Sequence, residues 1–356
     1  MISMFEEKYV TKKRSARLNK KAVVLLALIA FLGSILFLNY PFGTSGSFGP
    51  VTFGQILGSV GQLLIAPDQL VKGQEEGEIN VLLLGVGGNG YYGSTITDTI
   101  MIASIKLPDD DNGKTKVSLF SIPRDLAVEL PSGNRWHKIN EAYTYGQLRG
   151  EGIGGKWISD VVTEWTGMPI HYYAVVDFGA FRDGIDAIGG VEVDVEREFT
   201  DYSYPDYNFG TQTIHFDQGF QYLDGERALQ YTRSRKGNNG EGSDFARARR
   251  QQKVIWAVKE KVESYNVILD IRTISRVVES LSGKTDTDLE LWQMKRLYDL
   301  TKDVEQADVV SNTLDPRTGL VCSAIDEETQ LYVLRLCEGK TLDDIRLFAE
   351  KRFTER

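Results

Sequence analysis

Five arginines within residues 231–252 form the part of the chain best suited to binding an anion. Arg233 and Arg235 follow the apolar residues Leu229 and Tyr231 at alternating positions. Such alternation predicts a strand, on which side chains two residues apart point to the same side. Arginine keeps its charge at physiological pH and binds phosphate oxygens through two parallel hydrogen bonds. The segment therefore predicts a binding site for a small phosphorylated anion such as pyrophosphate.

The second half of this segment predicts a helix that begins near Phe245, after a Gly- and Asn-rich loop, with Ser243 or Asp244 as its N-cap. Arg249 falls on the helix face opposite the anion site, where we expect it to be exposed. Free backbone N–H groups at a helix N-terminus also favour anions. The alternative is a solvated helix start whose arginines pair with nearby carboxylates. Three polar side chains at i, i+3 and i+4 share the face predicted to hold the anion: Arg247, Arg250 and Gln251.

Three charged residues outside the arginine pattern are further candidates for the site. Asp98 lies within the run ITDTIMI, where an acidic residue is unfavourable in a strand. Arg124 directly follows an apolar strand in SIPRDL, and strand ends commonly carry functional groups in open α/β sheets. Asp244 could orient an arginine or hold a metal ion. For Asp98 and Arg124, a simple structural ion pair is the alternative.

The rest of the chain predicts a mixed α/β layer structure, because apolar runs and stretches with helical spacing alternate along it. Residues 200–215 are predicted to be a Tyr-rich loop, and residues 268–300 to be helical. A small hairpin and a terminal helix are expected within 313–356. Strands are further predicted at 79–86, 96–107, 116–125, 171–177, 191–198 and 229–235, and helices at 138–166 with an interrupting EGIGG loop, 178–188 and 245–265.

Several common catalytic motifs are absent from the sequence. The glycine loop GVGGNG lacks the Lys-Ser/Thr of a P-loop, and no strand–GxGxxG–helix unit can be drawn around it. It is predicted to be a turn, with a phosphate-lining loop as the alternative. The chain has three histidines and no Gly-x-Ser-x-Gly motif, which gives little support to a serine hydrolase or metallohydrolase.

The N-terminal region predicts a retained membrane anchor. Residues 22–40 form an uncharged apolar run that is long enough to cross a bilayer as a helix. Residues 1–21 are strongly basic, which predicts a cytoplasmic N-terminus and an extracellular remainder. A cleaved signal peptide is the alternative, but the run ends in large residues rather than in a small-residue cleavage site. Residues 41–77 are expected to connect the anchor to the folded part.

The distribution of charge argues against nucleic acid as a partner. The chain has a formal net charge of −9, and residues 1–21 hold seven Lys or Arg against two Glu, so the remainder carries about −14. An acidic domain of this kind is a poor non-specific partner for nucleic acid. The local cluster of arginines is therefore expected to serve a small anion.

The two cysteines, Cys322 and Cys337, flank the predicted C-terminal hairpin. In an oxidising exterior such a pair could form a disulfide. Two buried free thiols are the alternative, because strand register cannot be read from the sequence. Their spacing gives no indication of a zinc site.

Four groups of sequence motifs occur in order along the chain: INVLLLGVGG with TDTIMI, SIPRDLAVEL with HKINEAYTYG, FGAFRDGIDAIGGVEVDV, and LDGERALQYTRSR with SDFARARRQQ. In this combination they resemble the LytR-CpsA-Psr family of cell-wall ligases. The resemblance covers about residues 78–265 and leaves residues 266–356 as a C-terminal extension. It implies a three-layer α/β/α fold with a central mixed sheet, preceded by one transmembrane helix and followed by a small α+β segment. It also implies an apolar tunnel for a lipid tail beside the sheet.

The resemblance implies the transfer of a glycopolymer, such as teichoic acid or capsule polysaccharide, from undecaprenyl pyrophosphate to peptidoglycan. Asp98 and Asp244 match the family's acidic positions, which assist Mg²⁺ binding or orient arginines. Members often have an aspartate where this chain has Gly87, so we expect a weaker hold on Mg²⁺. The residues expected by position to hold the pyrophosphate are Arg124, Arg233, Arg235, Arg247 and Gln251.

The reaction expected from this resemblance is a phosphoryl transfer in which a peptidoglycan hydroxyl attacks the phosphorus that carries the glycopolymer. Arginines neutralise charge on the phosphate oxygens, and Asp98 is the preferred general base. Two alternatives remain. One is a non-catalytic protein that binds the lipid carrier or the cell wall, and the other is a prenyl pyrophosphatase in which water replaces the sugar.

Overall fold

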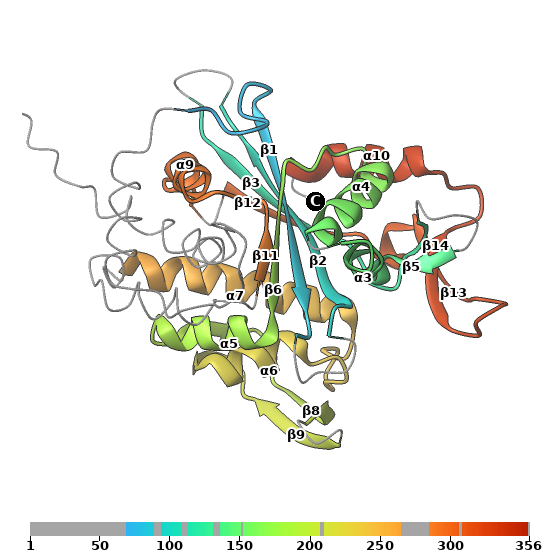
Figure 1. Cartoon of the computed structure of the whole chain (residues 1–356). Coiled ribbons are helices and arrows are strands. Elements are labelled where there is room, and N and C mark those ends of the chain that lie inside the picture. Colours follow the sequence, from blue (N-terminus) through green and yellow to red (C-terminus); the bar gives the residue numbers. More distant parts are fainter. Residues whose placement is uncertain are drawn as a thin grey trace, which may run out of the picture.

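The computed structural model describes residues 69–88, 94–108, 113–130, 136–150, 152–206, 210–264, 285–305 and 308–354. The predicted anchor at 22–40 and most of the predicted connector lie outside these ranges. Within the described ranges, every helix is too short or too polar to cross a membrane. The fold is mixed α/β, with a central mixed sheet and helices on both of its faces, as predicted (Figure 1).

The central sheet has six strands in the order β11-β6-β1-β2-β3-β12. The neighbouring strands β1, β2 and β3 run antiparallel, whereas β6 is parallel to β1 and β12 is parallel to β3. This arrangement brings the end of β1, the start of β2 and the end of β3 to one edge of the sheet. The strands are β1 Glu78–Val86, β2 Thr97–Lys106, β3 Lys116–Ser121, β6 Tyr172–Asp177, β11 Thr285–Thr287 and β12 Val309–Thr313.

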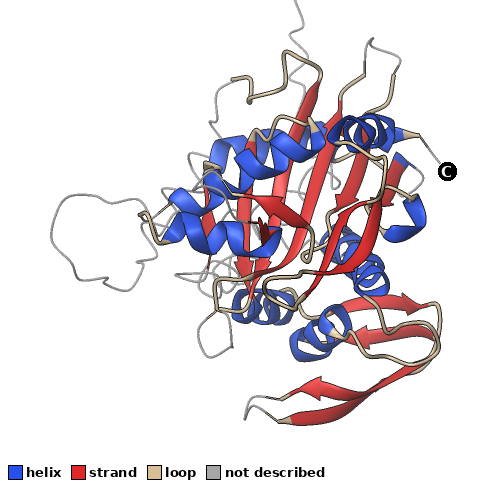
Figure 2. Cartoon of the chain, turned by 90° about the vertical axis from the view of Figure 1, so that its right-hand side faces the viewer, coloured by secondary structure: helices blue, strands red, loops and turns tan. Residues whose placement is uncertain are grey.

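Helices cover both faces of the sheet, which explains why the central strands are apolar almost throughout. Val81 faces one buried cluster and Leu82 the other, as the alternation of a strand requires. Figure 2 shows the sheet with helices in front of it and behind it. The face that carries Leu82 is covered by α3 Ala142–Gln147, α4 Ile153–Thr166 and α10 Leu342–Glu350. The face that carries Val81 is covered by α5 Phe178–Ala187, α6 Gly225–Arg233, α7 Asp244–Ser264 and α9 Leu291–Thr301.

Four two-stranded sheets and three short 3-10 helices complete the described fold. The paired strands are β4 Ala127–Glu129 with β5 Trp136–Lys138, β7 Val191–Val195 with β10 Gly219–Leu223, β8 Phe199–Pro205 with β9 Thr211–Phe216, and β13 Val321–Ile325 with β14 Tyr332–Leu336. The 3-10 helices are η2 Ile139–Glu141, η5 Pro316–Thr318 and η6 Lys351–Phe353.

Two sequence predictions near the arginine cluster are wrong. Residues 229–233 belong to helix α6 rather than to a strand, because the Asp224 side chain accepts a hydrogen bond from the Arg227 N–H at 2.8 Å and caps the helix. Residues 200–215 are not a loop, because most of them form the hairpin of β8 and β9. Buried Tyr204 and Ile214 anchor that hairpin on the protein.

The described residues after 284 are part of the main fold rather than a separate appendage. Strands β11 and β12 come from this range and form the two outer strands of the central sheet. Buried Arg352 donates from Nε to Ser104 Oγ at 3.0 Å and forms an ion pair with Glu78 at the start of β1. Its carbonyl oxygen accepts a hydrogen bond from Asn312 Nδ2 at 2.7 Å. The end of the described chain therefore makes polar contacts with strands β1, β2 and β12.

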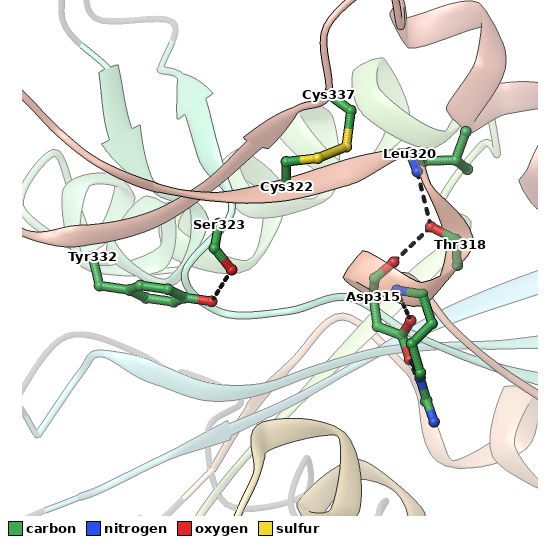
Figure 3. Close-up of a disulfide and its surroundings, with 8 residues drawn as sticks. Asp315, Thr318, Leu320, Cys322, Ser323, Tyr332 and Cys337 are labelled. Carbon is green, nitrogen blue, oxygen red and sulfur yellow. Dashed lines mark hydrogen bonds and ion pairs between the residues drawn. A yellow bond between two sulfur atoms is a disulfide. The ribbon is translucent and has the colours of Figure 1, made fainter.

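The predicted C-terminal hairpin is confirmed as β13 and β14, with a disulfide between Cys322 and Cys337 (Figure 3). The two Cα atoms are 5.0 Å apart. The Cys337 N–H donates to the Leu320 carbonyl at 3.0 Å, so the backbone closes the same end of the hairpin as the disulfide. Of the two alternatives for the cysteines, the structure contains the crosslink.

Candidate functional site

A cavity of about 610 Å³ lies at the edge of the sheet where β2 begins. It is enclosed by the ends of α6 and β3, the start of α7, and hairpins β8–β9 and β13–β14. The structure brings together most of the residues predicted from the sequence, since six of them line this cavity: Asp98, Arg233, Arg235, Asp244, Arg247 and Gln251.

Asp244 at the start of α7 holds two of the arginines. Arg235 donates from Nε to Oδ1 at 2.9 Å and from Nη2 to Oδ2 at 3.3 Å. Arg247 Nη1 lies 3.0 Å from the same Oδ1. Burial opposes ionisation of Asp244, but Arg247, Arg235 and Arg124 outweigh it and lower its pKa below the ordinary value. Asp244 is therefore an ionised group that fixes the arginines in place.

Arg247 is almost completely buried in the wall of the cavity. Its Nη2 donates to the carbonyl oxygen of Asp98 at 2.8 Å, which links helix α7 to strand β2. Burial lowers the pKa of Arg247 to about 10, and Asp244 and Asp98 oppose that decrease. The side chain is thus charged at neutral pH and poorly solvated, a state that favours binding of an anion.

Arg124, which follows β3, forms an ion pair with Asp98. Its Nε lies 3.6 Å from Asp125 Oδ2 and has no hydrogen-bond partner within the described residues. Burial works to lower the pKa of Arg124, but Asp98, Asp125 and Asp244 raise it. Arg124 itself is not among the residues that line the cavity, but its chain neighbours Pro123 and Asp125 are, so it adjoins the cavity through its ion pair with Asp98.

Arg233 and Gln251 lie where the cavity changes from polar to apolar. The guanidinium of Arg233 sits 4.3 Å from the centre of the Phe178 ring, and its Nη1 donates to Tyr204 Oη at 3.1 Å. Gln251 Nε2 donates to Thr99 Oγ1 at 2.8 Å. Both side chains also line a second, apolar cavity.

That second cavity is an apolar groove of about 160 Å³ between the sheet and helices α5, α6 and α7. It shares five lining residues with the arginine-lined cavity, so the two adjoin each other. A ligand with an anionic head and a hydrocarbon tail fits this combination of surfaces. The apolar side chains of the groove include Leu83, Val176, Phe181, Leu229, Val254 and Val258, and the shared residues are Thr99, Phe178, Thr232, Arg233 and Gln251.

Arg250 does not reach the cavity, although the helix spacing suggested it. It is buried, donates from Nε to the Tyr231 carbonyl at 2.8 Å, and pairs with Glu241 at 2.6 Å. Arg250 is a structural residue that joins α7 to the end of α6. The expectation for Arg249 is confirmed, since it lies outside this cavity, is partly exposed and pairs with Glu241 at 3.3 Å.

Some residues at the cavity were not identified from the sequence. Asp201 lines it and is buried; its Oδ2 accepts from Ser234 Oγ at 2.7 Å and from the Lys236 N–H at 3.1 Å. Burial opposes ionisation of Asp201, but hydrogen bonds from Ser234 and nearby backbone N–H groups lower its pKa. Asp201 thereby holds the loop that carries Arg235. Its one sequence signal is an acid directly before Tyr202, at the start of the tyrosine-rich segment.

The site can supply two carboxylates to a metal ion. Asp98 and Asp244 both line the cavity, and each is paired with arginine. Across the part of the chain that the structure describes, no group of three His, Cys, Asp or Glu side chains is arranged to bind a metal. Mg²⁺ often relies on one or two carboxylates together with substrate phosphates. The residues therefore fit Mg²⁺ if a phosphorylated ligand supplies the remaining oxygens.

Comparison with known proteins gives a consistent result. The family model described as LytR_cpsA_psr matches residues 63–334. The chain is 34% identical over 232 residues to an Oceanobacillus iheyensis protein named polyisoprenyl-teichoic acid–peptidoglycan teichoic acid transferase TagU, covering 65% of this chain and 64% of that protein. It is 30% identical over 215 residues to Bacillus subtilis TagV, named as the same kind of transferase, covering 60% of this chain and 50% of that protein. The alignments thus span less than two thirds of these relatives.

Solved structures share the fold. The crystal structure of B. subtilis TagV superimposes with a TM-score of 0.56 at 23% identity, covering 78% of this chain and 98% of that one. A structure of TagT bound to LI-WTA has a TM-score of 0.56 at 22% identity, covering 82% of this chain and 96% of that one. At these identities the similarity establishes the architecture.

Proposed function

The chain belongs to the LytR_cpsA_psr family, and on that premise we propose that it transfers a glycopolymer from a polyprenyl-pyrophosphate carrier to peptidoglycan. The observation that carries the proposal is that an arginine-lined cavity adjoins an apolar groove. A polyprenyl pyrophosphate has the matching parts, a diphosphate and a hydrocarbon tail. The names of the relatives, polyisoprenyl-teichoic acid–peptidoglycan teichoic acid transferases, support the same reaction.

In this proposal the arginines bind and polarise the diphosphate. Arg235 and Arg247 are already oriented by Asp244, so they lose little conformational freedom when a phosphate oxygen binds. Arg233 lies at the junction with the groove, where the lipid-bearing phosphate would enter. Arg124 neutralises the departing phosphate from the wall beside Asp98. Fixed positive charge in a poorly solvated site is an effective way to stabilise a phosphoryl-transfer transition state.

The chemical step forms one bond and breaks one. A hydroxyl oxygen of the acceptor sugar bonds to the phosphorus that carries the glycopolymer, and the bridging P–O bond breaks. Prenyl phosphate leaves with the electron pair of that bond. Asp98 accepts the proton of the hydroxyl when Arg124, its partner in the free protein, moves to the phosphate.

Mg²⁺ is part of the proposal as an ion that binds together with the substrate. Asp98 and Asp244 would hold it, and it would neutralise charge on the phosphate oxygens. Gly87, in place of a frequent aspartate, leaves the free protein with a weak site. We expect Mg²⁺ alone to raise the melting temperature little, and Mg²⁺ with geranylgeranyl pyrophosphate to raise it more than that ligand alone. Equal melting temperatures with and without Mg²⁺ in the presence of the ligand would argue against a metal.

The proposed location is the outer face of the cell membrane, with residues 22–40 as a single-pass anchor and residues 1–21 in the cytoplasm. The support is the length of the apolar run and its basic flank. An anchored domain outside the membrane would meet both a lipid-linked donor and peptidoglycan. Protease treatment of intact protoplasts should digest the residues after 41 and spare a tag placed before residue 1.

The direct test is transfer of labelled prenyl-pyrophosphate-linked glycan to peptidoglycan by the full-length protein. Arg247→Ala is expected to reduce transfer by at least about a hundredfold, the cost of losing one preorganised transition-state donor. Arg249→Ala removes an arginine from the same helix outside the cavity and is the matched control, expected to keep near-normal activity. Wild-type transfer by the Arg247 variant contradicts the assignment. Ligand binding without turnover by the wild type favours the binding-protein alternative, and release of glycan phosphate to water favours the pyrophosphatase.

A further inference from the structure

The C-terminal hairpin β13–β14 forms one wall of the arginine-lined cavity. Tyr332 and Leu334 of β14 both line it, and side chains two residues apart on a strand share a face. Leu334 is buried, whereas Tyr332 is 44% exposed. The hairpin therefore presents an accessible aromatic ring, seated on a buried leucine, to a ligand in the cavity.

The hairpin is attached to the segment that carries Arg124. The Leu334 N–H donates to the carbonyl of Asp125 at 2.9 Å, and Leu334 also forms a parallel bridge with Leu126. The disulfide between Cys322 and Cys337 crosslinks the end of the hairpin away from Tyr332. Tyr332 is thus held in a defined position relative to the arginines.

The Tyr332 ring has a defined orientation and apolar neighbours. Its Oη lies 3.1 Å from Ser323 Oγ on the paired strand, as Figure 3 shows. Ile325, its register partner, is 56% exposed, and Leu331 is 53% exposed. Ile325 shares the face of Tyr332, and the two side chains make a small exposed apolar surface, whereas Leu331 precedes Tyr332 and points to the other side of the hairpin. The C–H face of a pyranose sugar is also flat and apolar, so the two surfaces are complementary.

The position of the hairpin indicates which part of a substrate it meets. The residues common to the cavity and the apolar groove include Phe178 and Arg233, whereas Tyr332 and Leu334 line only the cavity. With its lipid tail in the groove and its diphosphate on the arginines, a donor directs its remaining substituent away from the groove. That substituent is the first sugar of the glycan.

Polar groups for the sugar hydroxyls line the same cavity. Lys236, Ser203 and Ser243 line it and can exchange hydrogen bonds with those hydroxyls. A few placed polar groups beside an apolar surface are the usual composition of a specific small-ligand site.

We propose that the Tyr332 face of hairpin β13–β14 is a sugar-binding subsite for the pyranose attached to the pyrophosphate of the donor. The proposal rests on the proposed function, because it assumes that the arginines hold the diphosphate. The Tyr332 ring packs on the C–H face of the sugar, while the cavity side chains bond its hydroxyls.

The test compares two ligands on the purified full-length protein in mild detergent: geranylgeranyl pyrophosphate, and the same molecule bearing N-acetylglucosamine or glucose on its diphosphate. Of the two sugar-bearing ligands, the one that the wild type binds more tightly is used. Tyr332→Ala is expected to weaken binding of that ligand about tenfold and to leave binding of the bare pyrophosphate unchanged. Tyr332→Phe keeps the ring and should bind nearly normally. Tyr222→Ala removes another exposed tyrosine, on β10 outside the cavity, and is the matched control.

Each other outcome has a distinct meaning. Equal loss for the bare and the sugar-bearing ligands, or no loss for either, overturns the subsite. A Tyr332 variant whose only defect is a raised KM for peptidoglycan in the transfer assay overturns the assignment to the donor sugar and places the acceptor there. Failure of the wild type to bind the bare pyrophosphate refutes the proposed function itself, and the subsite with it. Thermal unfolding of each variant shows whether a loss of binding reflects a loss of folding.

Discussion

Asp244 occupies a central position among the charged residues of the cavity. Its carboxylate contacts both Arg235 and Arg247, which come from a loop and from a helix. Two guanidinium groups that contact the same carboxylate are close enough to repel each other, and the negative charge between them offsets that repulsion. The carboxylate thus holds the arginines together before substrate arrives, and an arriving phosphate meets cations that are already aligned.

Asp244→Asn should destabilise the protein by about 1–3 kcal/mol at pH 7, because it removes charged hydrogen bonds from two arginines. The pKa of Asp244 is lower in the folded protein than in the unfolded chain. Its ionisation therefore favours folding above about pH 4, and this contribution is lost as the pH falls from there through the lowered pKa. Melting temperatures between pH 7 and pH 3 should decrease less steeply below pH 4 for the variant than for the wild type.

Asp343→Asn is the control for that experiment. Its side chain is 86% exposed and pairs with Arg346 on the surface of α10, where an ion pair contributes little. If the melting temperature of Asp244→Asn falls with pH in parallel with that of the wild type, the ionised Asp244 carboxylate does not stabilise the fold through its arginines.

Arg250 illustrates how far side-chain roles could be predicted from the sequence. Residues at i+3 and i+4 flank residue i on a helix but lie about 100° from each other. Arg247 and Gln251 therefore face the cavity, while Arg250 turns to Tyr231 and Glu241. The spacing of these residues predicts which side of α7 faces the site. It does not predict how far around the helix the cavity extends, because that depends on how α6 packs against α7.

At the scale of elements, the disulfide-linked hairpin should contribute measurably to stability. The cysteines are 15 residues apart, and closing a loop of that length contributes up to about 3 kcal/mol. The double variant Cys322→Ser/Cys337→Ser should melt at a lower temperature than the oxidised wild type and should not respond to reductant. A wild type whose melting temperature is the same with and without reductant would contradict this expectation.

The elements that could be predicted are those in which local pattern and tertiary context agree. Strands β1 and β2 are predicted correctly because their central residues are mostly apolar, as expected of buried central strands. Helix α6 differs from the predicted strand because Asp224 caps a helix there, while the spacing of Leu229, Tyr231 and Arg233 alone also fits a strand. Strands β8 and β9 were missed because their polar residues mask an alternation in which only one face is buried.

At the scale of the whole molecule, the central sheet needs residues from both ends of the described chain. A chain that ends at residue 305 lacks β12, α10 and hairpin β13–β14, and leaves β3 as an unprotected edge strand. Such a chain should fail to show cooperative thermal unfolding, whereas a chain that ends at residue 354 should unfold like the full-length protein. Circular dichroism on both chains tests this, and cooperative unfolding of the shorter one would show that the sheet folds without residues 306–356.

The contacts of Arg352 also have a consequence for biosynthesis. Its partners Ser104 and Glu78 lie 248 and 274 residues before it in the chain, so they leave the ribosome well ahead of the arginine. Until Arg352 follows, its partners on β1 and β2 remain without it, and Asn312 on β12 lacks the carbonyl oxygen to which it donates. Final assembly of the sheet therefore waits until residue 352 has left the ribosome, long after the first strands have been made.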